Sequence, residues 1–326
     1  MFDTRTLKLK IAISTSSVEC PVIGCARTVA RQRRTFRREP EFNCPEHGIY
    51  ISPSTFEYGD LQANLVGMDV EDLLLFARLA DGKAESGRMA RERSEDALTF
   101  NVFRGLERER ILDSVLTALT GCQSVNAVPS YWSLIGDTAE PHPMIDAARR
   151  AFHENMDHGT EPDLLIESVD TIFVIEAKLG SKHATVPTHA GVLPRYQTAA
   201  NGWYDSVLTS APAVVAVEEQ LYQLMRCWLL GSWMANAAGK KFVLVSLVSS
   251  ASDNSVTSRL GRHIAANEQR RCVRATWEGI RELIRNRNGL QESARLSALV
   301  DYLDHKSLGY DSRGLLQHAF APRGKE

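Results

Sequence analysis

A charged motif carried on two short apolar runs constrains the fold of this chain more than any other feature. Pro162-Asp163 precedes the apolar residues 164–166, and Glu176-Ala177-Lys178 follows the apolar residues 172–175. The polar residues 167–170 between the runs favour a turn, so the runs are predicted to form a β-hairpin. Because side chains alternate along a strand, Glu176 and Lys178 project from one face, and the turn brings Asp163 beside Glu176.

Two carboxylates beside an ammonium predict a site for a hard divalent cation. Mg²⁺ is bound by one or two carboxylates, with water and substrate phosphate completing its shell. A neighbouring lysine can orient or deprotonate a water molecule, or stabilise charge on a phosphoryl oxygen. Three charges on one sheet face are costly without a partner such as a metal. The alternative is a hairpin with a charged polar face. We expect Asp163, Glu176 and Lys178 to support metal-assisted phosphodiester hydrolysis.

A second metal site is predicted near the N-terminus. Cys20 and Cys25 are followed by Cys44 and His47, in two turns that contain Pro or Gly. Such ligand pairs suit tetrahedral Zn²⁺, which is structural when the protein supplies all four ligands. The second turn resembles a zinc-ribbon knuckle with His in place of the last Cys, and apolar residues 9–13 and 48–51 flank the knuckles. The alternative is that three cysteines and one histidine fall at these spacings by chance. The remaining cysteines are expected to be free buried thiols: Cys122, Cys227 and Cys272.

The segment between the two knuckles is rich in arginine. Guanidinium groups suit phosphate contact, although a solvated charged excursion explains the run equally well. The net charge of −2 gives no general attraction to a polyanion, so nucleic acid must meet a local basic patch. The residues expected to contact nucleic acid here are Arg31, Arg33, Arg34, Arg37 and Arg38.

Apolar periodicity predicts the remaining elements. Helices are expected over 69–79, over 94–120 with Ser94 and Gly121 as caps and a break near Arg108 left open, within 141–155, over 217–238, and from 258 to 304. Strands are expected within 123–135 and over 242–248. Residues 81–93 are predicted to be a linker or exposed helix start, residues 180–210 a loop, and residues beyond 309 a polar tail.

The composition is that of a soluble globular protein. The chain has 326 residues, 44% hydrophobic and 24% charged, which allows two or three domains. No apolar run has the length of a membrane span, and the N-terminus lacks a signal-peptide pattern. We therefore expect a cytoplasmic protein with no membrane partner.

The order of these elements, together with Pro162-Asp163 and Glu176-Ala177-Lys178, resembles the PD-(D/E)XK nuclease superfamily over residues 94–250. The resemblance implies an α/β fold: a restriction-endonuclease-like mixed β-sheet core flanked by helices. Residues 1–60 would add a small zinc ribbon with its arginine-rich insert, residues 61–93 a helical linker, and residues 251–326 a C-terminal helical extension and tail.

The resemblance also implies roles for individual residues. Members of the family hold Mg²⁺ or Mn²⁺ on the Asp and Glu of the motif, and the Lys assists the attacking water. These roles fall on Asp163, Glu176 and Lys178. Some members add a Glu from the first core helix or a Gln from the helix after the motif. The candidates for these positions are Glu95, with Glu107 and Glu109 as further options, and Gln220 or Gln223. Lys182 and His183 are candidate phosphate contacts or exposed loop residues.

The function that follows is a metal-dependent endonuclease that cleaves DNA, in a restriction, phage-defence or repair setting. Cutting both strands commonly requires two sites, which makes a homodimer or a larger defence or repair complex plausible. Two alternatives stay open. One is a non-catalytic nucleic-acid-binding or assembly subunit with the same fold, and the other is an RNA-directed nuclease.

Overall fold

The chain groups into two compact units, each built from stretches that are distant in sequence. The computed structural model describes residues 6–32, 36–83, 86–156, 159–181, 183–252, 255–287 and 292–320. Unit 1 comprises Met1–Leu73, Ala84–Gly105 and Arg281–Glu326, and unit 2 comprises Leu74–Lys83 and Leu106–Ile280. Three helices contribute residues to both units: α1 (Val70–Asp81), α2 (Glu95–Arg108) and α8 (Trp277–Arg285).

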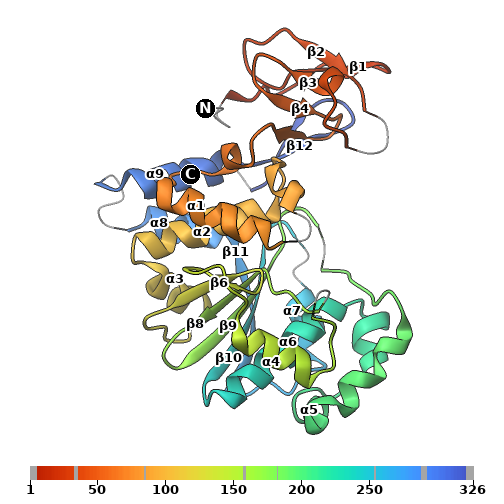
Figure 1. Ribbon diagram of the computed structural model, residues 1–326, viewed down its shortest axis with the longest axis vertical. Coiled ribbons are helices and arrows are strands. Elements are labelled where there is room, and N and C mark those ends of the chain that lie inside the picture. The colour runs from red at the N-terminus through yellow and green to blue at the C-terminus, as the bar shows by residue number, and fades with distance from the viewer. Residues whose placement is uncertain are drawn as a thin grey trace. The chain divides into compact units, whose positions relative to one another are not determined.

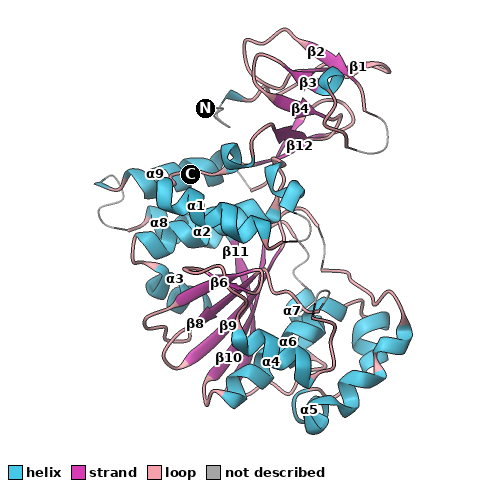
Figure 2. Ribbon diagram, viewed as in Figure 1, coloured by secondary structure: helices cyan, strands magenta, loops and turns pink. Residues whose placement is uncertain are grey.

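Unit 2 is built on a six-stranded sheet (Figures 1 and 2). Its strands are β6 (Val128–Tyr131), β7 (Leu134–Ile135), β8 (Leu164–Glu167), β9 (Thr171–Ala177), β10 (Lys241–Val248) and β11 (Arg270–Thr276). They lie in the order β11-β10-β9-β8-β6-β7. Strands β9, β10 and β11 are parallel, whereas β8, β6 and β7 pair antiparallel. The predicted mixed sheet is therefore confirmed.

Helices of unit 2 flank this sheet (Figure 1). They are α3 (Leu112–Thr120), α4 (Pro143–Ala151), α5 (Pro194–Val207), α6 (Tyr222–Ala237) and α7 (Val256–Gly261), with short turns η5 (Ala190–Val192) and η6 (Val214–Glu218). α4, α5 and α6 share a hydrophobic core with Val174 and Leu244. Gly231 lets α6 approach closely, because a Cβ there would lie 2.3 Å from the Phe242 ring. Of the helices that the structure describes, none has the length and apolarity to cross a membrane.

Unit 1 joins the N-terminal segment to a C-terminal hairpin. Its elements are β1 (Ser17–Glu19), β2 (Thr28–Ala30), η2 (Pro40–Phe42), β3 (Asn43–Cys44), β4 (Ile49–Ile51), β5 (Phe56–Tyr58), η3 (Leu61–Asn64), η4 (Ser86–Ala90), α9 (Ala294–His305), β12 (Ser307–Tyr310) and β13 (Leu316–His318). Tyr310 belongs to the same buried cluster as the N-terminal strands, and its N–H donates to Ser54 O at 2.8 Å. Gly309 is required at this contact, because its φ is +95° and a Cβ would lie 1.9 Å from Ser54 O. The prediction of a polar tail beyond 309 is therefore wrong.

The long helix expected over 94–120 is two helices, α2 and α3, with the break that was left open near Arg108. Both predicted caps are confirmed. Ser94 Oγ accepts a hydrogen bond from Ala97 N at 3.1 Å, and Gly121 ends α3 with a left-handed φ of 67°. The helix expected over 69–79 corresponds to α1, and that expected from 217 corresponds to α6.

Two other expectations are wrong. Residues 180–210 contain α5, whose periodicity is obscured because residues 199–202 leave the helical conformation. Residues 258–304 are not all helical, since β11 pairs with β10. β11 escaped prediction because it is an edge strand with charged side chains, as edge strands often are. Residues 81–93, predicted to be a linker or exposed helix start, contain η4, and Met89, Ala90 and Glu92 in this stretch are buried. In the apolar segment 9–13, Lys10 and Ile13 form isolated β-bridges with Leu315 and Val18.

Candidate functional site

The first candidate site gathers three cysteines and one histidine in unit 1. Cys20 follows β1, Cys25 precedes β2, Cys44 ends β3, and His47 lies in the turn before β4. Their ligand atoms all lie within 4.8 Å of one another. The Sγ atoms of Cys25 and Cys44 are 3.9 Å apart. His47 Nδ1 lies 3.7 Å from Cys20 Sγ and 3.5 Å from Cys44 Sγ.

These distances match the edges of a tetrahedral metal site. Bonds of about 2.3 Å to sulfur and about 2.0 Å to nitrogen place two sulfurs about 3.8 Å apart, and a sulfur about 3.5 Å from a nitrogen. Burial raises the pKa of the Cys20 thiol, so a thiolate at this position needs a cation beside it. The four predicted ligands can therefore hold a structural metal ion such as zinc, with every ligand supplied by the protein.

The β8–β9 hairpin of unit 2 builds the second candidate site. The two strands pair antiparallel with Leu164 opposite Ile175, so the register continued by one residue places Asp163 opposite Glu176. Asp163 Oδ2 accepts a hydrogen bond from Ala177 N at 2.8 Å. The predicted hairpin is confirmed, and it brings together the carboxylates that the sequence paired.

Lys178 contacts both carboxylates. Its Nζ lies 2.5 Å from Glu176 Oε1 and 3.8 Å from Asp163 Oδ2. Glu176 is fully buried and Lys178 is 8% exposed. The two carboxylates and the ammonium together carry a formal charge of −1, and they are largely excluded from solvent. Because an ionised carboxylate is costly to bury, a divalent cation at this point would lower that cost.

The backbone of Lys178 is fixed from two directions. Its N–H donates to Leu247 O at 2.8 Å, and its carbonyl accepts from Trp277 Nε1 at 3.1 Å. Trp277 is fully buried and opens α8 directly after β11. Trp277 was not predicted to contribute, because the strand that positions it was predicted to be helical. The sequence signal that could have identified it is a tryptophan directly after a strand-like run, because a buried indole N–H usually donates a hydrogen bond.

Further side chains surround Glu176 on the face covered by α6. Cys227 Sγ lies 3.9 Å from Glu176 Oε2, and burial, with the nearby Glu176 charge, raises the pKa of the Cys227 thiol. Cys227 is therefore a neutral thiol, free and buried as predicted. Ser246 lies opposite Glu176 in β10, and its Oγ is 2.9 Å from His183 Nε2. His183 is buried, not an exposed loop residue. These neighbours were not predicted.

The structure places the remaining candidates as follows. Glu95 lies in the first turn of α2, in unit 1, so its role beside Asp163 stays a prediction. Gln220 is exposed and precedes α6 with a left-handed φ of 55°, whereas Gln223 lies in the first turn of α6. Glu107 is in the last turn of α2, and Glu109 follows that helix.

The predicted arginines make local contacts where the structure describes them. Arg31 donates to Ser14 O at 2.7 Å. Arg37 lies 3.6 Å from Glu39, and Arg38 lies 2.5 Å from Glu57. The other basic candidates, Arg33, Arg34 and Lys182, lie outside the described residues.

Comparison with known proteins adds no relative from which a function can be transferred. No protein-family model, no curated protein and no solved structure matches this chain. Conclusions about function therefore depend on the geometry of the two sites.

Proposed function

We propose that this chain is a metal-dependent nuclease that hydrolyses phosphodiester bonds in DNA. The convergence of Asp163, Glu176 and Lys178 at the mouth of one hairpin carries the proposal. Asp163 and Glu176 would hold Mg²⁺ or Mn²⁺, because an oxygen-only donor set suits hard cations. Both carboxylates reach the same ammonium, so both are placed to reach one cation.

The protein's own groups have distinct roles in this proposal. A bound divalent ion supplies positive charge for the scissile phosphate and lowers the pKa of a bound water. Lys178 stabilises charge that develops on a phosphoryl oxygen, or orients the attacking water. Glu176 holds the ammonium through a charge-assisted hydrogen bond, while Leu247 and Trp277 fix the backbone that carries it.

The other parts of the proposal concern how the polymer is held. Zinc at Cys20, Cys25, Cys44 and His47 would stabilise the N-terminal segment, whose arginines would contact the phosphate backbone. A restriction, phage-defence or repair setting would suit such an enzyme, and a homodimer would allow both strands to be cut.

Cleavage of plasmid DNA with Mg²⁺ or Mn²⁺ tests the proposal. We expect Asp163→Ala and Lys178→Ala each to abolish cleavage. Asp170→Ala and Lys241→Ala are matched controls, because they remove the same charges from exposed residues in the turn before β9 and at the start of β10, at the opposite end of β9 from the site. Cleavage that persists in both site variants, or that disappears equally in the controls, would refute the assignment.

A second candidate is a nucleic-acid-binding subunit without turnover. It is favoured by the direct pairing of Lys178 with both carboxylates, because an ammonium can neutralise them without a metal. Salt-sensitive DNA binding without cleavage across divalent metals would support this candidate. Labelled RNA tested in parallel distinguishes an RNA-directed nuclease, because the site chemistry does not depend on the sugar.

A further inference from the structure

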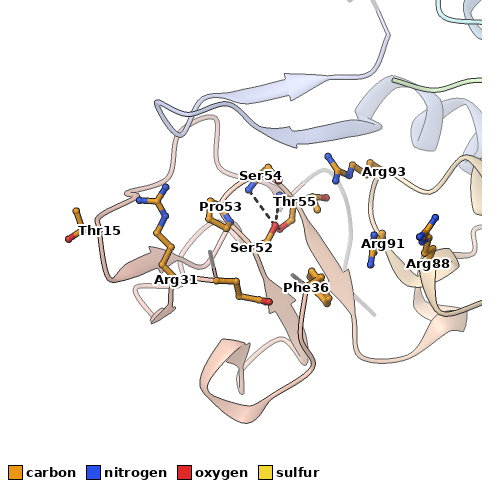
Figure 3. Close-up of a pocket in the computed structure, with 11 residues that line it drawn as sticks. Thr15, Arg31, Phe36, Ser52, Pro53, Ser54, Thr55, Arg88, Arg91 and Arg93 are labelled. Atoms are coloured by element: carbon orange, nitrogen blue, oxygen red, sulfur yellow. Dashed lines mark hydrogen bonds between the residues drawn. The ribbon is translucent and has the colours of Figure 1, made fainter. Parts of the chain in front are cut away.

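Unit 1 contains a cavity of about 750 Å³ that lies apart from its Cys₃His cluster. Its walls come from residues far apart in sequence. Figure 3 shows Arg31 on one side of the turn formed by residues 52–55, and Arg88, Arg91 and Arg93 on the other. Only Arg31 among these four belongs to the arginine-rich segment. The other three come from η4 and the residues after it, in a stretch predicted to be a linker.

The cavity is strongly basic. Among the described residues that line it, four are arginines and none is acidic. The buried Glu57 lies 3.2 Å from Arg91 and also pairs with Arg38 at 2.5 Å. One carboxylate thus offsets two arginines. A concave surface lined by one sign of charge concentrates its field, so this cavity attracts anions.

The other lining groups suit a phosphorylated and partly aromatic ligand. Phe36 is half-buried in the wall, with the Arg91 guanidinium 5.2 Å from its ring centroid. Thr55 is buried, and its Oγ1 has no hydrogen-bond partner in the described part of the chain. A buried hydroxyl without a partner is costly, and a ligand or ordered water offsets such a cost. Guanidinium and hydroxyl groups are the side chains that most often contact phosphate.

We infer that this arginine cavity binds the phosphates of an unpaired nucleic-acid strand. Proteins that bind single strands combine a basic groove with aromatic or guanidinium surfaces on which bases stack. A cavity of this volume has room for a ligand of nucleotide size, whereas the phosphates of a duplex lie on a broad convex surface. The inference rests on the proposed function only for the choice of nucleic acid as polymer, because its residues lie in unit 1 and the nuclease residues lie in unit 2.

Fluorescence anisotropy of the full chain with a labelled single-stranded oligonucleotide of about 16 nucleotides tests the inference. The test variant is Arg88→Gln/Arg93→Gln, because both residues are exposed at the cavity. Arg91 is left intact to preserve its pair with Glu57. The charge control is the double variant Arg313→Gln/Lys10→Gln, whose two residues are exposed in unit 1 and do not line the cavity. Thermal melting confirms that each variant is folded.

We expect the cavity variant to lose about 100-fold in affinity, about tenfold for each phosphate contact. The slope of log affinity against log salt should fall by about 1.4, because each single-strand phosphate contact contributes about 0.7. Equal affinity in the cavity variant, or an equal loss in the control, would overturn the inference. Tighter binding of a duplex would overturn the unpaired-strand assignment. Displacement of the strand by an equimolar poly-glutamate peptide would indicate an acidic protein partner instead.

The same assay separates this inference from the proposed function. Asp163→Asn should bind the strand as tightly as the unchanged protein, because Asp163 is outside the cavity. Strand binding that depends on Arg88 and Arg93 in a chain that never cleaves would refute the nuclease and support the cavity. Cleavage by a chain whose strand binding does not change when these arginines are substituted would support the nuclease and refute the cavity.

Discussion

Asp163 accepts a hydrogen bond from the backbone N–H of Ala177, which joins its carboxylate to the neighbouring strand. Asp163 therefore serves the hairpin as well as the proposed metal site. Asn at this position keeps an acceptor oxygen for Ala177, whereas Ala leaves that N–H without this partner. We predict that Asp163→Asn changes the free energy of unfolding by less than about 1 kcal/mol, and that Asp163→Ala lowers it by about 1–2 kcal/mol. Urea unfolding measures both, and equal losses would contradict the structural role.

Metal removal should destabilise unit 1. We expect about one zinc ion per purified chain, and a strong chelator should lower Tm by about 10 °C or more, because structural zinc contributes directly to folding. Cys44→Ser should lose the ion, since Cys44 lies within the four-residue cluster. Cys122→Ser is the control, because Cys122 is free and outside the cluster. Metal analysis and thermal melting check both, and a metal-free protein with an unchanged Tm would exclude this site.

Low pH should weaken the buried ion pair between Glu154 and Arg226. Glu154 is buried, and it pairs with Arg226 at 3.1 Å and accepts from the Thr160 hydroxyl at 2.8 Å. Burial acts to raise the pKa of Glu154, but the Arg226 charge and the hydrogen bonds outweigh it, so this pKa lies below the usual 4.5. A lowered pKa means that the carboxylate stabilises the fold above about pH 4.5 and loses this contribution as pH falls through the folded-state pKa.

Glu154→Gln should therefore lower the free energy of unfolding most near neutral pH. We predict a loss of about 3 kcal/mol near pH 7, because Arg226 keeps its buried charge without a carboxylate. The difference between the variant and the unchanged protein should shrink as the pH falls below 4.5. Urea unfolding across this range measures it, with exposed Glu268→Gln as the charge control. A difference that stays constant with pH would contradict the ionic role.

Thr55→Val should raise the stability of the ligand-free protein. The Thr55 hydroxyl is buried without a partner in the described part of the chain, so its removal loses no hydrogen bond there. Valine has nearly the same shape and avoids the desolvation cost, which is about 1 kcal/mol or more. Thermal melting should show a higher Tm than for Ser52→Ala, which breaks the hydrogen bond from Thr55 N. A lower Tm for Thr55→Val would show that the hydroxyl is satisfied.

Local signals predicted those parts of the fold that depend on neighbouring residues. The β8–β9 hairpin follows from two apolar runs around a polar turn, and the ends of α2 and α3 follow from Ser94 and Gly121. α5 and β11 escaped prediction for tertiary reasons. The first is interrupted by non-helical residues, and the second is a charged edge strand whose place is fixed by pairing with β10.

The candidate sites likewise divide into a part that local sequence signals predict and a part that depends on tertiary packing. Cys20, Cys25, Cys44 and His47 could be grouped from the sequence because two tight turns suffice to present them, and the structure brings them together. The surroundings of Glu176 could not be predicted in this way. Cys227 reaches it from a helix some fifty residues later, and this proximity depends on how α6 packs on the sheet. The arginine cavity likewise combines two distant segments.

The packing of β12 against the turn at Ser54 has a consequence for synthesis. Residues 307–310 leave the ribosome about 250 residues after β4, which takes about 13–50 s at ordinary elongation rates. During that interval the N-terminal segment is translated but lacks the Tyr310 side chain that completes its buried cluster. A metal ion captured by the four ligands would hold the nascent segment in shape over this delay. Zinc starvation should then lower the yield of folded protein made in the cell more than it destabilises protein that has already folded.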